Sequence, residues 1–227
     1  NNCRSVYPAP VRLAEEESEA RRLAHEAIEK ACTLGFRQES EDFFFIERSF
    51  EDFRDLLELA GGVRDGHQLK AVIPGGCSMP VMPADVIMET DLDYDSLSKA
   101  GSALGSAGMI VMDDSTCMVK ALMRISRFYY AESCGQCTPC REGCGWMYRV
   151  IKRIEEGRGS MEDIDLLESA AGQIEGHTIC AFGDAAAWPV QSFVKHFRHE
   201  FEYHVTHRNC MPGTSSHRAT GSEGAAA

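Results

Sequence analysis

Residues 132–146 read ESCGQCTPCREGCGW, and four cysteines fall within this short stretch at the spacing C-x2-C-x2-C-x3-C. They are Cys134, Cys137, Cys140 and Cys144. Structural zinc usually takes two C-x2-C pairs that are well separated in sequence. Three thiolates this close together instead favour a cubane of iron and sulfide, in which each cysteine binds a different iron. The run therefore predicts an iron-sulfur site, with zinc as the alternative.

The last cysteine of the run, Cys144, is interpreted as a packing residue on a helix. In a ferredoxin-type run the last cysteine is followed by proline and binds a second cluster, which needs a run of its own. Here Cys144 is followed by Gly145, and the sequence has no second run. A fourth ligand for the first cluster must therefore come from elsewhere.

Cys180 is the best candidate for that fourth ligand. It lies 40 residues after Cys140, between two expected helices, and a helical hairpin would return its loop to the cysteine run. Cys210 is a weaker candidate, because it stands where regular structure is expected to end. The spacing His204-x2-His207-x2-Cys210 also suggests a metal, but such residues are more typical of a frayed terminus.

The remaining composition limits the possible functions. The chain has 227 residues, 44% of them hydrophobic, which is enough for a packed core. Its net charge of -12 argues against nucleic acid, because phosphate binding needs clustered Lys and Arg. No apolar run approaches the roughly 18 residues of a membrane span, since prolines and glycines interrupt residues 71–88. We expect a protein that is soluble or peripheral to a membrane complex.

Ten cysteines are a high count. A chain of this length does not need disulfide cross-links to be stable, and the cysteines are not spaced as in a disulfide-rich domain. We expect a reducing compartment. The cysteines outside the predicted site are interpreted as free thiols, mostly buried: Cys3, Cys32, Cys77, Cys117, Cys144 and Cys210.

The apolar periodicity predicts an α+β chain with a mixed first half and a helical second half, divided near residues 112–115. Helices are expected at 12–34, 51–60, 95–100, from 115 onward, at 141–156, from 160 onward and at 186–203. Strands are expected at 43–47, 69–76 and 109–113. A capping box, Ser160-x-x-Asp163, is expected to begin the third helix of the second half.

Three motifs occur together in one order: AGGVRDGHQLKAVIPGG, ESCGQCTPCREG and HTICAFGDAAAWPVQSFVKHFRHEFE. Over residues 50–205 the chain resembles the NADH-oxidising flavoprotein subunit of respiratory complex I, a family with relatives in NAD-linked hydrogenases and formate dehydrogenases. The resemblance implies a small ubiquitin-like β-grasp domain followed by a four-helix iron-sulfur bundle. The expected divisions are an N-terminal helical segment 1–36, the β-grasp domain 37–113, the 4Fe-4S domain 114–205 and a flexible tail 206–227.

The resemblance also implies the site and its role. The family's cluster ligands fall on Cys134, Cys137, Cys140 and Cys180, the same residues that the spacing favours. Such a cluster takes electrons from reduced flavin and passes them toward quinone. The chain would then serve as a subunit of NADH:ubiquinone oxidoreductase, with a flavin-bearing half and a 2Fe-2S subunit among its partners.

The sequence departs from the family in one respect. The family binds FMN and NADH through a glycine-rich loop like GRGGAGFP and an acidic GEE segment, and this sequence has neither. We therefore expect FMN and NADH on a partner chain or a missing domain, and no NADH oxidation by this chain alone. The expected location is the matrix side of the mitochondrial inner membrane, peripherally bound, or the cytoplasmic face of a bacterial membrane.

Two other functions stay open at this point. The chain is alternatively a redox-silent structural or assembly module with zinc in the four-cysteine site, or a β-grasp domain that binds a small ligand in its own right. Metal content separates the first of these from the electron relay.

Overall fold

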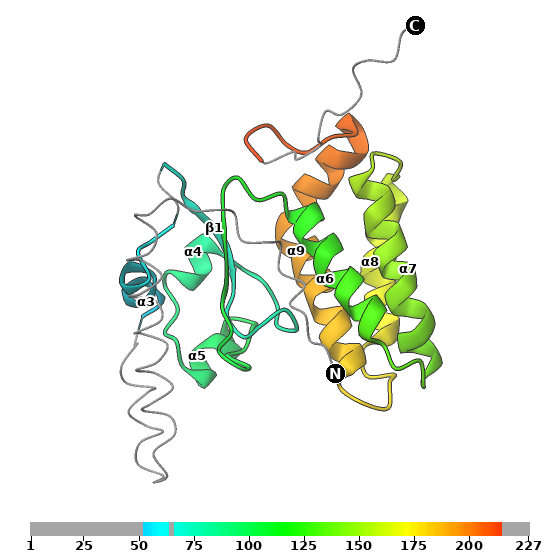
Figure 1. Ribbon diagram of the computed structural model, residues 1–227, viewed down its shortest axis with the longest axis horizontal. Helices are drawn as coiled ribbons and strands as arrows, with labels where there is room; N and C mark the ends of the chain where they lie inside the picture. The colour runs from blue at the N-terminus through cyan, green and yellow to red at the C-terminus, as the bar shows by residue number, and fades with distance from the viewer. Residues whose placement is uncertain (1–51, 64–65, 215–227) are drawn as a thin grey trace, which may run out of the picture. The chain divides into compact units, whose positions relative to one another are not determined.

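The computed structural model describes residues 52–63 and 66–214, which fall into two compact units divided after Gly62 (Figure 1). The described part of the first unit contains α3 (Phe53–Leu59), where the Asp52 side chain accepts a hydrogen bond from the Arg54 amide at 2.9 Å. This helix was predicted at 51–60. The predicted helix at 12–34 and strand at 43–47 lie outside the described residues.

The second unit begins with a three-stranded antiparallel sheet. Its strands are β1 (Leu69–Ile73), β2 (Met82–Pro83) and β3 (Ile110–Asp113), in the order β2-β1-β3. The strand β1 is central, pairing Ala71 with Pro83 on one side and with Met112 on the other. Two short helices, α4 (Ala84–Ile87) and α5 (Tyr94–Lys99), lie between β2 and β3 in the chain. The strands β1 and β3 and the helix α5 were predicted, whereas β2 and α4 were not.

Four longer helices follow the sheet: α6 (Met118–Glu132), α7 (Thr138–Glu155), α8 (Met161–Ile174) and α9 (Phe182–His207). Each packs on the next, and α9 also packs on α6 and α7. Their buried apolar faces join the buried residues Ala71, Ile73, Val81 and Met112 of the sheet region in one core. The prediction of an α+β chain with a helical second half is confirmed, and no described helix has an apolar stretch long enough to cross a membrane.

The helix α7 begins earlier than predicted. It starts at Thr138, three residues before the expected start, and Pro139 fits its first turn, where the missing N–H of proline is not needed. Part of the cysteine run is therefore helical rather than loop. The predicted capping box of α8 is confirmed, with the Ser160 amide donating to Asp163 Oδ2 at 2.9 Å.

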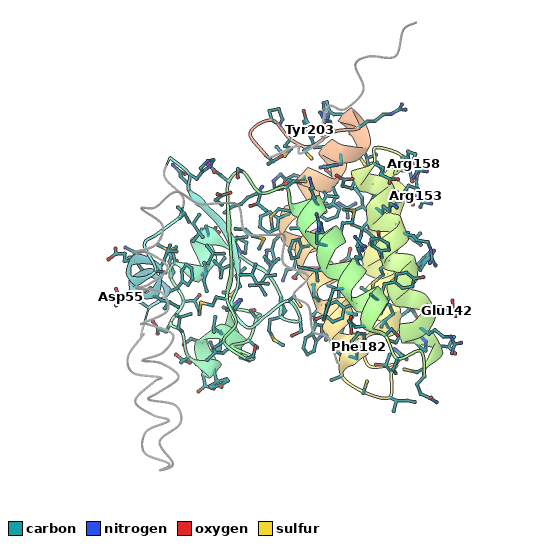
Figure 2. All side chains as sticks on the ribbon, in the orientation of Figure 1. Asp55, Glu142, Arg153, Arg158, Phe182 and Tyr203 are labelled. Carbon is teal, nitrogen blue, oxygen red and sulfur yellow. The ribbon has the colours of Figure 1, made fainter. Side chains whose placement is uncertain are left out.

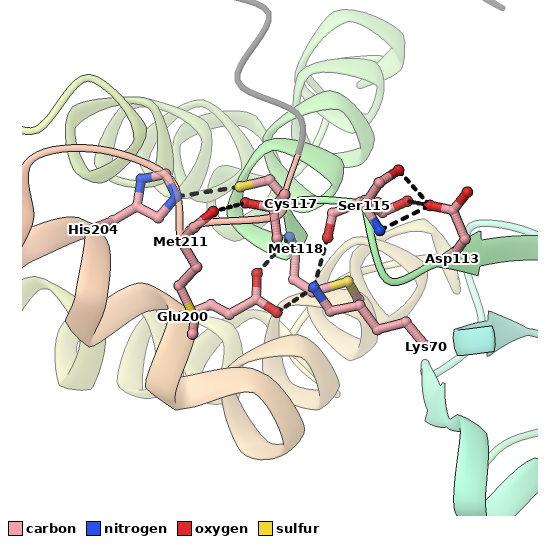
Figure 3. Close-up of polar contacts among 10 residues, drawn as sticks. Lys70, Asp113, Ser115, Cys117, Met118, Glu200, His204 and Met211 are labelled. Carbon is pink, nitrogen blue, oxygen red and sulfur yellow. Dashed lines mark hydrogen bonds and ion pairs between the residues drawn. The ribbon is translucent and has the colours of Figure 1, made fainter. Parts of the chain in front are cut away.

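A buried carboxylate joins the sheet to two helices (Figure 3). Glu200 on α9 is 1% exposed, and its Oε2 accepts a hydrogen bond from the Met118 amide at the start of α6, at 3.1 Å. Its Oε1 pairs with Lys70 Nζ of β1 at 2.6 Å, and Lys70 also donates to the Thr116 carbonyl at 2.6 Å. Both charges are thus paired and hydrogen-bonded, as burial requires.

Replacing Lys70 by methionine leaves the Glu200 charge buried without its cation. We expect Lys70→Met to lower the free energy of unfolding by about 3–5 kcal/mol, because a buried charge then lacks its partner. Urea unfolding followed by circular dichroism measures this change. A second substitution, Glu200→Gln, is expected to restore most of the loss.

The matched control is the exposed ion pair between Arg198 and Asp165, whose side chains are 40% and 68% exposed. Asp165→Asn is expected to cost less than about 1 kcal/mol. A Lys70→Met variant no less stable than Asp165→Asn would contradict the structural role of the buried pair.

Candidate metal centre

The start of α7 positions three of the four cysteines in the run. Cys137 is the N-cap residue of α7, while Cys140 and Cys144 lie within its first two turns. Cys140 and Cys144 are buried, Cys137 is half-buried, and Cys134 is exposed in the preceding loop. The run therefore extends from the surface into the core at this end of α7.

Arg141 fixes the loop that carries Cys134. Its guanidinium donates to the Gly135 carbonyl at 3.0 Å and to Thr138 Oγ1 at 3.4 Å. Gly135 has a φ of 76°, a left-handed conformation that glycine adopts without a steric penalty. Arg141 thus shapes the loop, and its Nε also pairs with the Glu142 carboxylate at 3.0 Å.

Cys140 contacts two neutral groups. Its Sγ lies 3.2 Å from Ser133 Oγ and 3.8 Å from Cys144 Sγ. Burial, followed by the effect of the neighbouring Cys140, raises the pKa of Cys144 to about 12. Cys144 is therefore a protonated thiol packed in the core, in agreement with its interpretation as a packing residue.

A second loop, at 175–181, is held against the start of α9 by a set of hydrogen bonds. The Glu175 carboxylate accepts from Trp188 Nε1 at 2.6 Å and from Gln191 Nε2 at 2.8 Å. The Gly176 amide donates to Asp184 Oδ1 at 2.7 Å. These contacts fix the first residues of the loop that carries Cys180 against α9, the helix into which the loop leads.

Close packing holds Cys180 itself. The hydroxyl of Thr178 donates to the Cys180 carbonyl at 2.8 Å, and the methyl and hydroxyl of Thr178 lie against Gly183. A Cβ at Gly183 would lie 2.3 Å from Thr178 Oγ1, so glycine is required for this approach. The side chain of Cys180 remains exposed.

The two loops lie at the same end of the helices, as Figure 1 shows. The ring of Phe182, two residues after Cys180, meets the ring of Tyr129 edge to face with centroids 5.3 Å apart. Tyr129 is in the last turn of α6, shortly before Cys134. Figure 2 labels Phe182 and Glu142 at this end. The expected return of the Cys180 loop to the cysteine run is what the structure shows.

Two helix ends lie beside the predicted ligands. The helices α7 and α9 begin after Cys137 and Ala181, and their amino-terminal ends carry partial positive charge.

A second group of possible ligands was not predicted in this form. Cys117, His204 and Cys210 place their ligand atoms within 4.8 Å of one another. The sequence suggested His204 and Cys210 together with His207, but His207 instead stacks on Tyr203. Cys117 precedes His204 by 87 residues, so no local spacing signalled its approach.

The cysteine run lies within a region that matches a known family. Residues 120–204 match the NADH-ubiquinone oxidoreductase-F iron-sulfur binding region. These residues are related to that region. All four predicted ligands fall inside the matched range, whereas Cys117 and Cys210 fall outside it.

Similar proteins extend the likeness beyond this region. The chain is 56% identical over 154 residues to an NADH-quinone oxidoreductase subunit of Rickettsia bellii, covering 67% of this chain and 37% of that protein. It is 54% identical over 155 residues to the corresponding NADH-quinone oxidoreductase subunit of Rhizobium meliloti, covering 67% of this chain and 36% of that protein. The chain thus spans little more than a third of the length of these relatives.

A solved structure shows the same fold. In the crystal structure of an NAD+-reducing NiFe-hydrogenase in the H2-reduced state, a chain is similar with a TM-score of 0.61 and 25% identity. The likeness covers 73% of this chain and 28% of that one. The mixed α/β arrangement therefore recurs as part of a longer chain.

The Gly183 contact generates a prediction for the site. Gly183→Ala is expected to displace the Thr178–Cys180 loop, because threonine is stiff at χ1 and cannot move aside without losing its hydrogen bond. We expect a loss of about 1–3 kcal/mol in unfolding free energy and a lower iron content after anaerobic reconstitution.

Gly172→Ala is the matched control, since Gly172 lies on an exposed face of α8 with nothing within 4 Å of an added Cβ. It is expected to raise the free energy of unfolding by about 1 kcal/mol and to leave iron content unchanged. Equal iron content in both variants would show that the Gly183 contact does not position Cys180.

Proposed function

We propose that this chain is the electron-transfer part of a complex I-type NADH dehydrogenase and relays electrons from flavin through a 4Fe-4S cluster toward quinone. The cluster ligands in this proposal are Cys134, Cys137, Cys140 and Cys180. The match of residues 120–204 to an iron-sulfur binding region is the observation that carries it. The chain would act as a subunit of NADH:ubiquinone oxidoreductase.

The residues around the thiols fit an anionic cluster, which when bound accepts and donates single electrons. Two helix amino termini lie beside the thiols, and their partial positive charge attracts an anionic group. The Ser133 hydroxyl lies 3.2 Å from Cys140 Sγ and is placed to donate to a ligand sulfur. Hydrogen bonds to the sulfurs, together with burial, set the potential of such a cluster.

The finer architecture belongs to the same proposal. Residues 37–113 form a β-grasp domain and residues 114–205 a four-helix 4Fe-4S bundle, between an N-terminal segment 1–36 and a tail 206–227. Within the described residues, the antiparallel sheet with its short helices and the mutual packing of α6 to α9 support a boundary near residue 113. The core continues across residue 113, so the two parts are expected to fold together.

The partners follow from what the cluster needs. FMN and NADH are supplied by a partner chain or another domain, and a 2Fe-2S subunit belongs to the same assembly. The exposed thiols of Cys134 and Cys180, with Ile179 at 77% exposure beside them, mark the face for electron entry. The location is peripheral, on the matrix side of the mitochondrial inner membrane or on the cytoplasmic face of a bacterial membrane; the relatives named above are bacterial.

Iron and sulfide analysis of anaerobically purified protein, with electron paramagnetic resonance before and after dithionite, tests this function. We expect about four irons and four sulfides per chain and a signal in the reduced state. Cys180→Ser is expected to abolish the signal, because it removes a ligand. Cys144→Ser, which removes a neighbouring thiol that is not a ligand, is expected to keep it.

The competing function is a redox-silent structural or assembly module with zinc bound by the same four cysteines. Stoichiometric zinc that is lost in Cys180→Ser, with no paramagnetic signal, would replace the relay by this module. The C-x2-C-x2-C spacing of Cys134, Cys137 and Cys140 favours the cluster over a single ion.

A further inference from the structure

A second cluster of soft ligands lies at the other end of α9 from Cys180. Cys117 precedes the first residue of α6, His204 is in the last turns of α9, and Cys210 follows α9 (Figure 3 shows the first two). Cys117 and His204 are 3% and 0% exposed, and Cys210 packs against the core. Two thiols and an imidazole thus meet in a largely buried place.

The distances match those around one tetrahedral ion. His204 Nε2 lies 3.2 Å from Cys117 Sγ, and the ligand atoms of all three residues lie within 4.8 Å of one another. Zinc bonds of about 2.3 Å to sulfur and about 2.0–2.1 Å to nitrogen place tetrahedral ligand atoms about 3.5–3.8 Å apart. Only small side-chain movements would bring these atoms onto a common ion.

The backbone after α9 is folded so that Cys210 returns to the helices. Arg208 adopts a left-handed conformation with φ 57°, and its amide donates to the His204 carbonyl at 2.8 Å. Arg208 also lies so close to Gly157, after α7, that a Cβ there would be 2.7 Å away. A further turn, from Met211 to Thr214, follows Cys210. This reversal of the chain places Cys210 beside Cys117. It requires Arg208 to adopt a left-handed conformation, which is unfavourable for a residue other than glycine.

We propose that Cys117, His204 and Cys210 bind one zinc ion, with water as the fourth ligand. Thiolate and imidazole ligands suit zinc among the common divalent ions. On binding, the two thiols lose their protons to solvent and the histidine binds as neutral imidazole. The bound site then has no net charge, which makes its burial inexpensive.

The surroundings bear on the fourth ligand and on the relation to the cluster. The nearby carboxylate of Glu200 is already bonded to Lys70 and to the Met118 amide, so it is not the fourth ligand. His204 lies near the end of α9, whereas Cys180 precedes its start, so this site is separate from the proposed cluster. The ion would fasten residues 208–214 to the start of α6.

Zinc and iron content of the full 227-residue chain, purified anaerobically with its cluster assembled, tests the site. We expect about one zinc per chain in addition to the cluster iron. Competition with a zinc-binding dye should show at least about tenfold weaker binding in Cys210→Ser and in His204→Gln, since even loss of an outer partner has that effect. Cobalt substitution should give a thiolate-to-cobalt charge-transfer band that these variants lose.

His207→Gln is the matched control, because His207 is exposed one turn away and stacks on Tyr203 instead. It should keep zinc, and Cys180→Ser should keep the same Cys210-dependent zinc. Cys210 is only half-buried, so its variant is expected to fold as judged by circular dichroism. Absence of zinc, zinc binding unchanged in Cys210→Ser, or a Cys117–Cys210 disulfide in the anaerobic protein would overturn the proposal.

Discussion

The carboxylate of Glu200 is the constraint on which the second unit depends. A charge this deeply buried costs several kcal/mol unless every bond it needs is made. Its partners come from β1 and from the first residue of α6, so α9 can occupy only the position where all three meet. The position of the first residue of α6 is thereby fixed. The direction of α6 then determines the position of the cysteine run, which follows its last residue.

At that other end the chain uses ring packing, side-chain hydrogen bonds and close approach at a glycine. The ring of Phe182 packs on Tyr129, Glu175 accepts from Trp188, and Gly183 admits Thr178. Together these contacts hold two loops side by side and leave the thiols of Cys134 and Cys180 at the surface. The helices on either side of these loops determine where the thiols lie. A site for an inorganic group requires ligands that are held in position in this way.

Local signals in the sequence predicted most of the helices and the two longer strands. Ser160 and Asp163 act within one turn, so their capping box is readable from the sequence. The two-residue strand β2 exists only through its pairing with β1, and no local pattern marks it. The same applies to Cys117 and His204, which are 87 residues apart and meet because of tertiary packing alone. The predicted cluster ligands, by contrast, have a local signal, because three of the four follow one another in a run.

The length of α9 separates the two groups of possible metal ligands at its ends. Its 26 residues correspond to about 39 Å of regular helix, less the effect of the non-helical backbone at Phe197. Cys180 precedes one end and His204 lies near the other, so no single ion or oxidant molecule bridges them. A small, surface-limited reagent reaches the exposed thiols of the first end before the buried thiol of Cys117. Cys134 and Cys180 are therefore distinguishable from Cys117 by the order in which they are alkylated.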